Sequence, residues 1–461
     1  MSRRARLLAA GVVLAAAATL LGRPLGAQPA PGGTAPAAPA AFGPALLFAM
    51  NDGRSGLELW RADAGGAPPR QLLDIRPGPA GSYPSGFTLL GEPGAGGALY
   101  FTANDGQHGL ELWRTDGTPA GTRQVADIQP GAADGLPNHL AVLGGQLLFS
   151  ADDGQHGFEL WASRGDAAST RLLADLHPGP GGSSPRLFTA VGDQLFFVAD
   201  DGRHGAELWV TDGTREGTRL VKDIRPGPEA AQPQQLVVVD GRLFFVADDG
   251  RHGGELWTSD GTAAGTRLVA DQRPGATGAN PRYLTAWRGA LYFAADDGQH
   301  GTELWRCDGE GRQLQLVADI APGPAHAVPS FLTPAGDLLY FSANDGLHGS
   351  ELWATDGTRG GTRMVADLLP GPSPSAPNRL WAHGRQLLFA ALHPDKGYEL
   401  HISDGTAEGT RLLADLNPGT GSSYPHDFTR VGDTVFFIAD GAEGLTRLWT
   451  LAPDGRITAL P

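Results

Sequence analysis

A tripeptide, Glu-Leu-Trp, recurs along the chain at a fixed spacing. It begins at six positions that are 48 residues apart each time: Glu111, Glu159, Glu207, Glu255, Glu303 and Glu351. The same register continues to Glu399 and Arg447, and an earlier copy begins at Glu58. A fixed period of this size indicates a propeller, a solenoid or an array of one supersecondary unit. The chain therefore contains nine copies of one unit.

Residues 183–223 show what one copy contains. A short apolar segment at 187–189 is followed by three longer ones at 194–202, 205–214 and 217–227, each ending at a turn signal. Asp-Gly closes two of these segments, and it supplies the positive φ that tight hairpins require. None of the segments has helical periodicity, so one copy reads as four short strands.

Four antiparallel strands in 48 residues are the size of a propeller blade. We therefore expect an all-β fold, a β-propeller of about nine four-stranded blades, in a single domain over residues 42–461. Two alternatives stay open. The first strand of the first copy is degenerate, which would leave an eight-bladed propeller with an irregular end. A β-solenoid is the other architecture that such repeats build.

Tryptophan occupies the third position of the tripeptide in eight copies. These residues are Trp60, Trp113, Trp161, Trp209, Trp257, Trp305, Trp353 and Trp449. The strands before them are nearly continuous apolar runs, as at 195–199, which is typical of strands covered on both faces. We expect each indole to pack between neighbouring blades, with a ring of aromatic ligand platforms as the alternative.

The glutamate of the tripeptide lies two residues before the tryptophan, so on a strand the two side chains share a face. A glutamate that is buried in this way needs a partner. The Thr-Arg dipeptide before the last strand supplies a candidate in six copies: Arg123, Arg171, Arg219, Arg267, Arg363 and Arg411. We expect a structural Glu–Arg pair in each blade except the last, where Arg447 replaces the glutamate.

The string E-L-W-x-x-D-G-T-x-x-G-T is complete at 111–122, 207–218, 255–266 and 351–362. It resembles the ELWxxDGTxxGT repeat family of exported bacterial proteins, which often carry a hyalin-like label. The resemblance covers about residues 45–456, and it implies a repetitive β-protein outside the cell with little said about activity. The order of strands and Asp-Gly turns also resembles NHL-type propeller blades, in which the first strand is innermost.

Alternate turns of an antiparallel sheet lie at the same end. The Asp-Gly-x-His-Gly hairpins and the Pro-Gly crossovers to the next blade should therefore share one face, the crossover face. We expect it to be the binding face because it carries the long loops. The candidate binding residues are the acid and the histidine of each such hairpin: Asp105, His108, Asp153, His156, Asp201, His204, Asp249, His252, Asp297, His300, Asp345 and His348.

Each of these pairs also has a simpler role, which is a hydrogen bond within its own turn. The spacing matches no zinc motif, and the pairs belong to different blades, so we expect no metal or cofactor. Calcium is the one ion that the oxygen-rich hairpins could hold, although no loop has EF-hand spacing. A further series of acids is expected to cap the crossover turns: Asp127, Asp175, Asp223, Asp271, Asp319, Asp367 and Asp415.

No catalytic motif stands out in the sequence. A single active site requires a break in the periodicity, and such breaks occur at 391–396 and 307–310. Neither resembles a nucleophile elbow, a metal triad or a carboxylate pair. Cys307, the only cysteine, occupies a place where other copies have Thr or Ser. We therefore expect no enzyme.

The first 27 residues have the features of a secretory signal peptide. Arg3, Arg4 and Arg6 precede an uncharged run at 7–21, and a small-residue cleavage site ends at Ala27. Residues 28–41 form a Pro/Ala-rich spacer. No later segment is apolar for long enough to span a membrane. We expect a protein secreted to the periplasm or the exterior.

The chain carries a formal charge of −15, which argues against nucleic acid and anionic membranes as partners. We expect a monomeric, secreted, non-enzymatic binding or interaction module for protein or glycan. The alternatives are a calcium-stabilised adhesion module and a polysaccharide-directed enzyme that uses the central channel.

Overall fold

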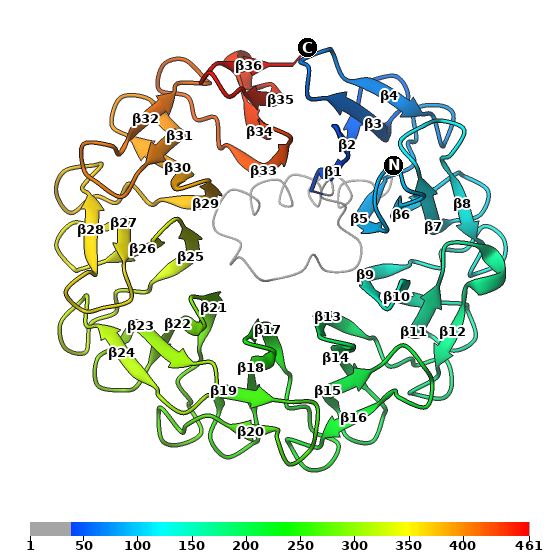
Figure 1. Cartoon of the computed structure of the whole chain (residues 1–461), viewed down its shortest axis with the longest axis horizontal. Coiled ribbons are helices and arrows are strands. Elements are labelled where there is room, and N and C mark those ends of the chain that lie inside the picture. The colour runs from blue at the N-terminus through cyan, green and yellow to red at the C-terminus, as the bar shows by residue number, and fades with distance from the viewer. Residues whose placement is uncertain (1–37, 461) are drawn as a thin grey trace, which may run out of the picture. The chain divides into compact units, whose positions relative to one another are not determined.

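The computed structural model describes residues 38–460 and shows nine four-stranded antiparallel sheets arranged in a ring (Figure 1). Blade 1 contains strands β1 to β4, and each later blade contains the next four strands in chain order. The predicted nine-bladed β-propeller is confirmed. The eight-bladed alternative is wrong because the degenerate first segment still forms an inner strand, and the solenoid is wrong because the sheets form a ring.

The first strand of each blade borders the centre of the ring (Figure 1). These inner strands are β1 (Ala40–Phe42), β5 (Ser85–Leu90), β9 (Asn138–Leu143), β13 (Arg186–Val191), β17 (Gln234–Val239), β21 (Arg282–Trp287), β25 (Ser330–Ala335), β29 (Asn378–His383) and β33 (His426–Val431). The second strands are β2 (Ala45–Asn51), β6 (Ala98–Asn104), β10 (Gln146–Asp152), β14 (Gln194–Asp200), β18 (Arg242–Asp248), β22 (Ala290–Asp296), β26 (Leu338–Asn344), β30 (Gln386–His393) and β34 (Thr434–Asp440).

The third strands carry the repeated tripeptide or its variants. They are β3 (Leu57–Asp63), β7 (Leu110–Thr115), β11 (Phe158–Ser163), β15 (Ala206–Thr211), β19 (Gly254–Ser259), β23 (Thr302–Asp308), β27 (Ser350–Thr355), β31 (Gly397–Ser403) and β35 (Thr446–Leu451). The outer strands are β4 (Arg70–Leu73), β8 (Arg123–Ala126), β12 (Arg171–Ala174), β16 (Arg219–Lys222), β20 (Arg267–Leu268), β24 (Gln315–Ala318), β28 (Arg363–Ala366), β32 (Arg411–Ala414) and β36 (Ile457–Ala459).

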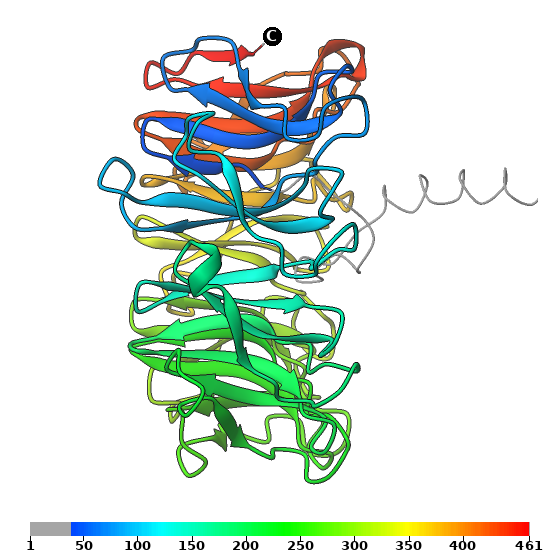
Figure 2. The same cartoon turned by 90° about the vertical axis from the view of Figure 1, so that its right-hand side faces the viewer.

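Two short 3₁₀ turns, η1 (Ala167–Ser169) and η2 (Ala442–Gly444), are the helical elements of the described residues. Within residues 38–460, no helix has the length and apolar character needed to cross a membrane. Figure 2 shows the ring from its edge, where the strands run across its thickness and the loops form two opposite faces.

The core lies between blades. One buried cluster joins Leu148 and Leu160 of blade 3 with Phe197 and Trp209 of blade 4. Equivalent clusters recur around the ring, which explains why the second strands are apolar on both faces. Trp209 is 7% exposed, and its indole N–H donates to the Ala199 carbonyl at 3.1 Å. The prediction that this tryptophan packs between blades is confirmed.

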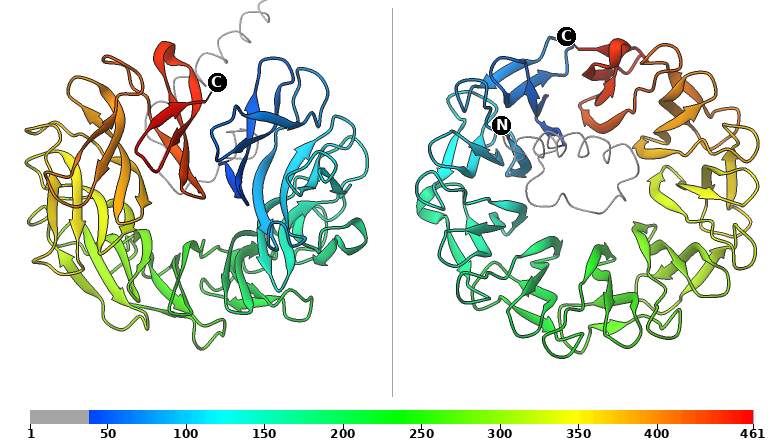
Figure 3. Two further views of the ribbon diagram at one scale, coloured as in Figure 1. Left: turned by 45° about the horizontal axis from the view of Figure 1, so that its top comes forward. Right: turned by 180° about the vertical axis from the view of Figure 1, so that it is seen from behind.

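The ring closes by packing of blade 9 against blade 1, which lie side by side in Figure 3. Leu46 and Phe48 of blade 1 contact Val431 and Phe436 of blade 9 in one buried cluster. Each of these two sheets is built from its own four strands, so no strand is shared across the closure. The junction therefore depends on side-chain burial, as every other interface between blades does.

The boundary of the ring differs slightly from the predicted one. Strand β1 begins at Ala40, inside the segment 28–41 that the sequence assigned to the spacer. The predicted signal peptide at 1–27 and the spacer residues 28–37 lie outside the described residues.

Candidate functional site

The predicted binding residues occupy the hairpins between the second and third strands. In blade 4, Asp201 Oδ1 accepts hydrogen bonds from the N–H groups of Arg203 and His204, both at 2.9 Å. Asp201 Oδ2 lies 2.8 Å from His204 Nδ1. The same arrangement joins the other five pairs: Asp105 and His108, Asp153 and His156, Asp249 and His252, Asp297 and His300, Asp345 and His348. Each pair therefore stabilises its own turn.

The two members of a pair shift each other's protonation. The hydrogen bond that His204 donates to the Asp201 carboxylate raises the pKa of His204, and the charge of Asp201 adds to this effect. Partial burial works to raise the pKa of Asp201, but the hydrogen bonds from His204 and Arg203 lower it overall. A charged imidazolium–carboxylate pair is thus favoured at mildly acidic pH.

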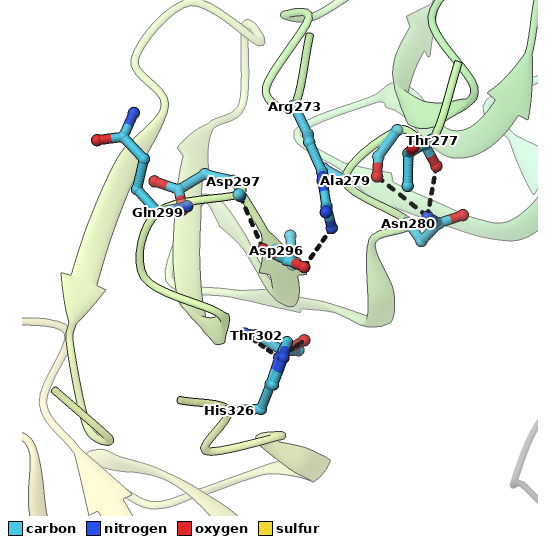
Figure 4. A network of polar contacts seen from close by, with 12 residues as sticks. Arg273, Thr277, Ala279, Asn280, Asp296, Asp297, Gln299, Thr302 and His326 are labelled. Carbon is cyan, nitrogen blue, oxygen red and sulfur yellow. Dashed lines mark hydrogen bonds and ion pairs between the residues drawn. The ribbon is translucent and has the colours of Figure 1, made fainter. Parts of the chain in front are cut away.

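The hairpins and the crossovers lie on the same face. Figure 4 shows the crossover that leaves blade 5, where the Arg273 guanidinium pairs with Asp296 at the start of the next blade's hairpin. The six Asp–His pairs stay separate, each on its own blade. Within residues 38–460, no group of three His, Cys, Asp or Glu side chains is arranged to hold a metal ion. Ligand binding at these hairpins stays a prediction.

The repeated glutamates hold the crossovers. Glu207 is fully buried, and it accepts hydrogen bonds from the N–H groups of Ile224 at 3.2 Å and Arg225 at 3.0 Å. The remaining blades, apart from the last, each have an equivalent carboxylate with the same role: Glu58, Glu111, Glu159, Glu255, Glu303, Glu351 and Glu399. Arg447 takes this place in blade 9, where the ring closes on β1 and no crossover to a next blade has to be held.

The predicted Glu–Arg pair is wrong. Arg219 pairs in the sheet with Val210, at the opposite end of β15 from Glu207. Its guanidinium instead donates to the Gly261 carbonyl of the next blade at 2.8 Å. The arginine thus ties neighbouring blades together on the Asp-Gly-Thr face, while the glutamate organises the crossover face.

Three of the seven acids predicted to cap the Pro-Gly turns do so. Within residues 38–460, Asp175, Asp271, Asp319 and Asp415 make no such hydrogen bond. Asp223 Oδ2 accepts from the Gly227 N–H at 3.4 Å, and Asp127 and Asp367 make the matching contacts with Gly131 and Gly371.

The inner strands are strained in a regular way. Each of the eight from β5 to β33 contains a bulge whose residue has a positive φ: Gly86, His139, Leu187, Gln235, Tyr283, Phe331, Arg379 and Asp427. A left-handed conformation costs a non-glycine residue on the order of 1–2 kcal/mol. Backbone strain of this kind often accompanies a functional surface. The residue type at this position differs in every blade, unlike the repeated Asp, His, Glu and Trp.

The inner strands of blades 8 and 9 depart from the repeat at three positions. Trp381 occupies the place of Thr189 in blade 4, and His383 occupies that of Val191. Arg430 of β33 stands where blade 4 has Ala190. Arg430 Nη2 lies 2.9 Å from His383 Nδ1, and its guanidinium carbon is 5.8 Å from the centre of the Trp381 ring.

Sequence reasoning noticed the irregular hairpin at 391–396 but missed this inner-strand cluster. The missing signal is a comparison of equivalent positions in the inner strands, where Trp381 is the only aromatic residue, His383 the only histidine and Arg430 the only charged residue at its position. Phe42 and Trp287 share the position of His383. The other break, at 307–310, contains no reactive thiol: Cys307 is fully buried, and burial raises its pKa to about 12.

Together these features define a nine-bladed β-propeller with one asymmetric polar and aromatic cluster on its inner strands. No model of a known protein family matches the chain, and no curated protein matches it in sequence.

Solved structures do match. Two structures of puromycin hydrolase, one of them an S511A mutant complexed with PGG, cover 95% of this chain and 61% of their own at 17–18% identity, with TM-scores of 0.42 and 0.43. A prolyl endopeptidase structure matches 70% of this chain and 49% of its own at 12% identity and a TM-score of 0.43. Oligopeptidase B from Leishmania major matches 70% and 48% at 11% identity and a TM-score of 0.44.

The chain thus spans roughly half to three-fifths of the length of these proteins. The comparison with solved structures contradicts the prediction of a non-enzymatic binding module, because all four structures are those of hydrolytic enzymes. A likeness at this identity and TM-score carries no argument about the activity of this chain.

Proposed function

We propose that the chain is a hydrolytic enzyme, and that its ring contacts the substrate at the inner strands of blades 8 and 9. The observation that supports this proposal is the Trp381–His383–Arg430 cluster. A ring of equivalent blades offers equivalent surfaces, whereas one substrate in one orientation requires a surface that occurs once. At the positions that match Arg430 and His383, no other inner strand has an arginine or a histidine, and at the position that matches Trp381 none has an aromatic residue.

The chemistry of the cluster suits recognition. A guanidinium offers a planar set of N–H donors, and aromatic faces add contact area at a small cost in conformational entropy. Arg430 is exposed, and Trp381 and Phe428 are half-buried, so these groups are held in place and still reachable. Phe428 stacks on Trp381 with 5.8 Å between ring centres, which fixes the orientation of the indole.

Hydrolysis of peptides and aminoacyl amides is the activity to test first. This choice of assay follows the names of the matching structures. The purified full chain would be incubated with a mixture of short peptides and with puromycin, and the products would be identified by mass spectrometry. We expect cleavage that falls at least tenfold in Arg430→Ala. Arg282→Ala, which removes an exposed inner-strand arginine of blade 6, is the matched control and should leave the rate unchanged. Intact substrates after prolonged incubation would contradict the proposal.

We further propose that the protein acts outside the cytoplasm after cleavage near Ala27. The charged and apolar pattern of the first 27 residues supports this location. N-terminal sequencing of the protein from the cell exterior or periplasm is the test, and an intact Met1 on the mature protein would contradict it.

A further inference from the structure

The contact between Arg430 and His383 determines which imidazole nitrogen carries the proton. A guanidinium has donors only, so His383 Nδ1 must accept the hydrogen bond from Arg430 Nη2. Partial burial, followed by the neighbouring Arg430 charge, lowers the pKa of His383. The ring is therefore neutral near pH 7, with its proton on Nε2. Both side chains then present N–H donors to a ligand.

Arg430 has no carboxylate partner. None of the ion pairs among residues 38–460 involves its guanidinium. The inner strands as a group carry four arginines and a single acid, although the chain as a whole has a charge of −15. These arginines are Arg186, Arg282, Arg379 and Arg430. An unpaired cation on an acidic protein favours an anionic ligand.

An aromatic surface lies directly beside the donors. Trp381 stacks on Phe428, and its ring centre is 6.1 Å from that of His383. The Arg430 guanidinium lies over the same indole, which holds the charged group against a flat apolar surface. A ligand that joins an anion to an apolar or planar group would contact both parts of this cluster.

We infer that Arg430, His383 and Trp381 form a binding site for the free carboxylate of an organic ligand that carries an aromatic or apolar side chain, such as the C-terminus of a peptide. This inference rests on the proposed function and names the substrate class at the same site. One guanidinium and one neutral N–H donor match the charge and the two oxygens of a carboxylate. A phosphate dianion would need further cations, and no other arginine or lysine is in contact with this pair in residues 38–460.

The test measures binding of two probes to the full chain by isothermal titration calorimetry at pH 7.5. N-acetyl-L-phenylalanine carries the carboxylate, and its amide lacks it. We expect the acid to bind at least tenfold more tightly than the amide, and this preference to disappear in Arg430→Ala. Alanine stands at the matching position in blades 4, 6 and 8, as Ala190, Ala286 and Ala382, so this variant is compatible with the fold.

Arg282→Ala is the matched control and should retain the preference. Equal binding of acid and amide, or unchanged binding in Arg430→Ala, would overturn the inference. Inorganic phosphate that competes at lower concentration than the acid would overturn the assignment to a carboxylate. Binding of the acid without cleavage of any peptide supports this site and counts against the proposed hydrolytic function, so the two failures can be told apart.

Discussion

Ser183 donates two hydrogen bonds to the buried carboxylate of Glu159, from Oγ to Oε2 at 2.6 Å and from its N–H to Oε1 at 2.9 Å. Serine occupies this crossover position in blades 1, 3, 7 and 8, as Ser82, Ser183, Ser375 and Ser423. The other four blades with a glutamate have Gly135, Ala231, Ala279 or Ala327 there. Burial raises the pKa of all eight glutamates, and in the four blades without serine it raises that pKa to about 7.

The first prediction follows for blade 5. Glu255 Oε2 is buried and has no hydrogen-bond partner among the described residues, while Ala279 donates only its N–H to Oε1 at 2.8 Å. Ala279→Ser should supply the missing donor, as Ser183 does in blade 3. We expect a gain in unfolding free energy of about 1–2 kcal/mol at pH 7.5, measured by denaturant unfolding. Ser183→Ala should lose a similar amount. A loss of stability in Ala279→Ser would contradict this account.

Gly135 is unsuitable for the same substitution. A Cβ at that position would lie 2.5 Å from Glu111 Oε1, so a serine would displace the carboxylate that it is meant to stabilise.

The second prediction concerns the hydrogen bonds that the buried glutamate of each blade accepts from the crossover. Both oxygens of Glu159 accept hydrogen bonds, and the partners include the N–H groups of Leu176 and His177. In Glu159→Gln the amide NH₂ would face donors in place of one oxygen. Leaving such groups unpaired in the interior should cost about 2–3 kcal/mol. Arg447→Gln changes the exposed equivalent position in blade 9, and it should stay within about 0.5 kcal/mol of the parent. Equal losses in the two variants would refute the anchoring role.

The third prediction is a fall in stability as the pH rises from 6 to 8. Four glutamates, at 111, 207, 255 and 303, have a folded pKa of about 7 against an ordinary value of 4.5. Between these values the folded state binds more protons than the unfolded state, so stability decreases as the pH rises. The histidines of the hairpins act in the same direction, because their raised pKa gives stability that is lost above the folded value.

Calorimetric melting at pH 6 and pH 8 measures this effect, and we expect the lower melting temperature at pH 8. The variant Ala279→Ser should show a smaller difference, since a donor to Glu255 favours the charged form. A melting temperature that is constant or rises toward pH 8 would exclude the glutamates as the source.

The partners of these glutamates could not have been found by reading the sequence. The period of 48 residues was enough to predict nine blades, four strands in each and the packing of Trp209. The hydrogen bonds to Glu207, by contrast, come from backbone N–H groups, which nearly every residue type has, so the sequence does not mark them. A search for an oppositely charged side chain therefore selected Arg219, which lies at the other end of the strand.

The inner-strand cluster escaped prediction for a different reason. His383 and Arg430 are 47 residues apart, one residue less than the period of the repeat. They therefore do not occupy equivalent positions of two blades. Their contact arises only because neighbouring inner strands run side by side at the centre of the ring (Figure 1).

The last prediction concerns His401, which replaces the repeated tryptophan in blade 8. It is 1% exposed and lies 5.4 Å from Phe389 between ring centres. Burial lowers its pKa to about 4, with the neighbouring His393 adding to the effect. Below its ordinary pKa of 6.5 the unfolded state binds a proton that the folded state does not, so stability is lost as the pH falls from 6.5 toward 4. His401→Phe removes this proton-linked loss and should stabilise the ring by about 2 kcal/mol more at pH 5 than at pH 7.5. Chemical denaturation of both proteins at the two pH values is the measurement. An equal change at both would mean that folding does not lower the pKa of His401.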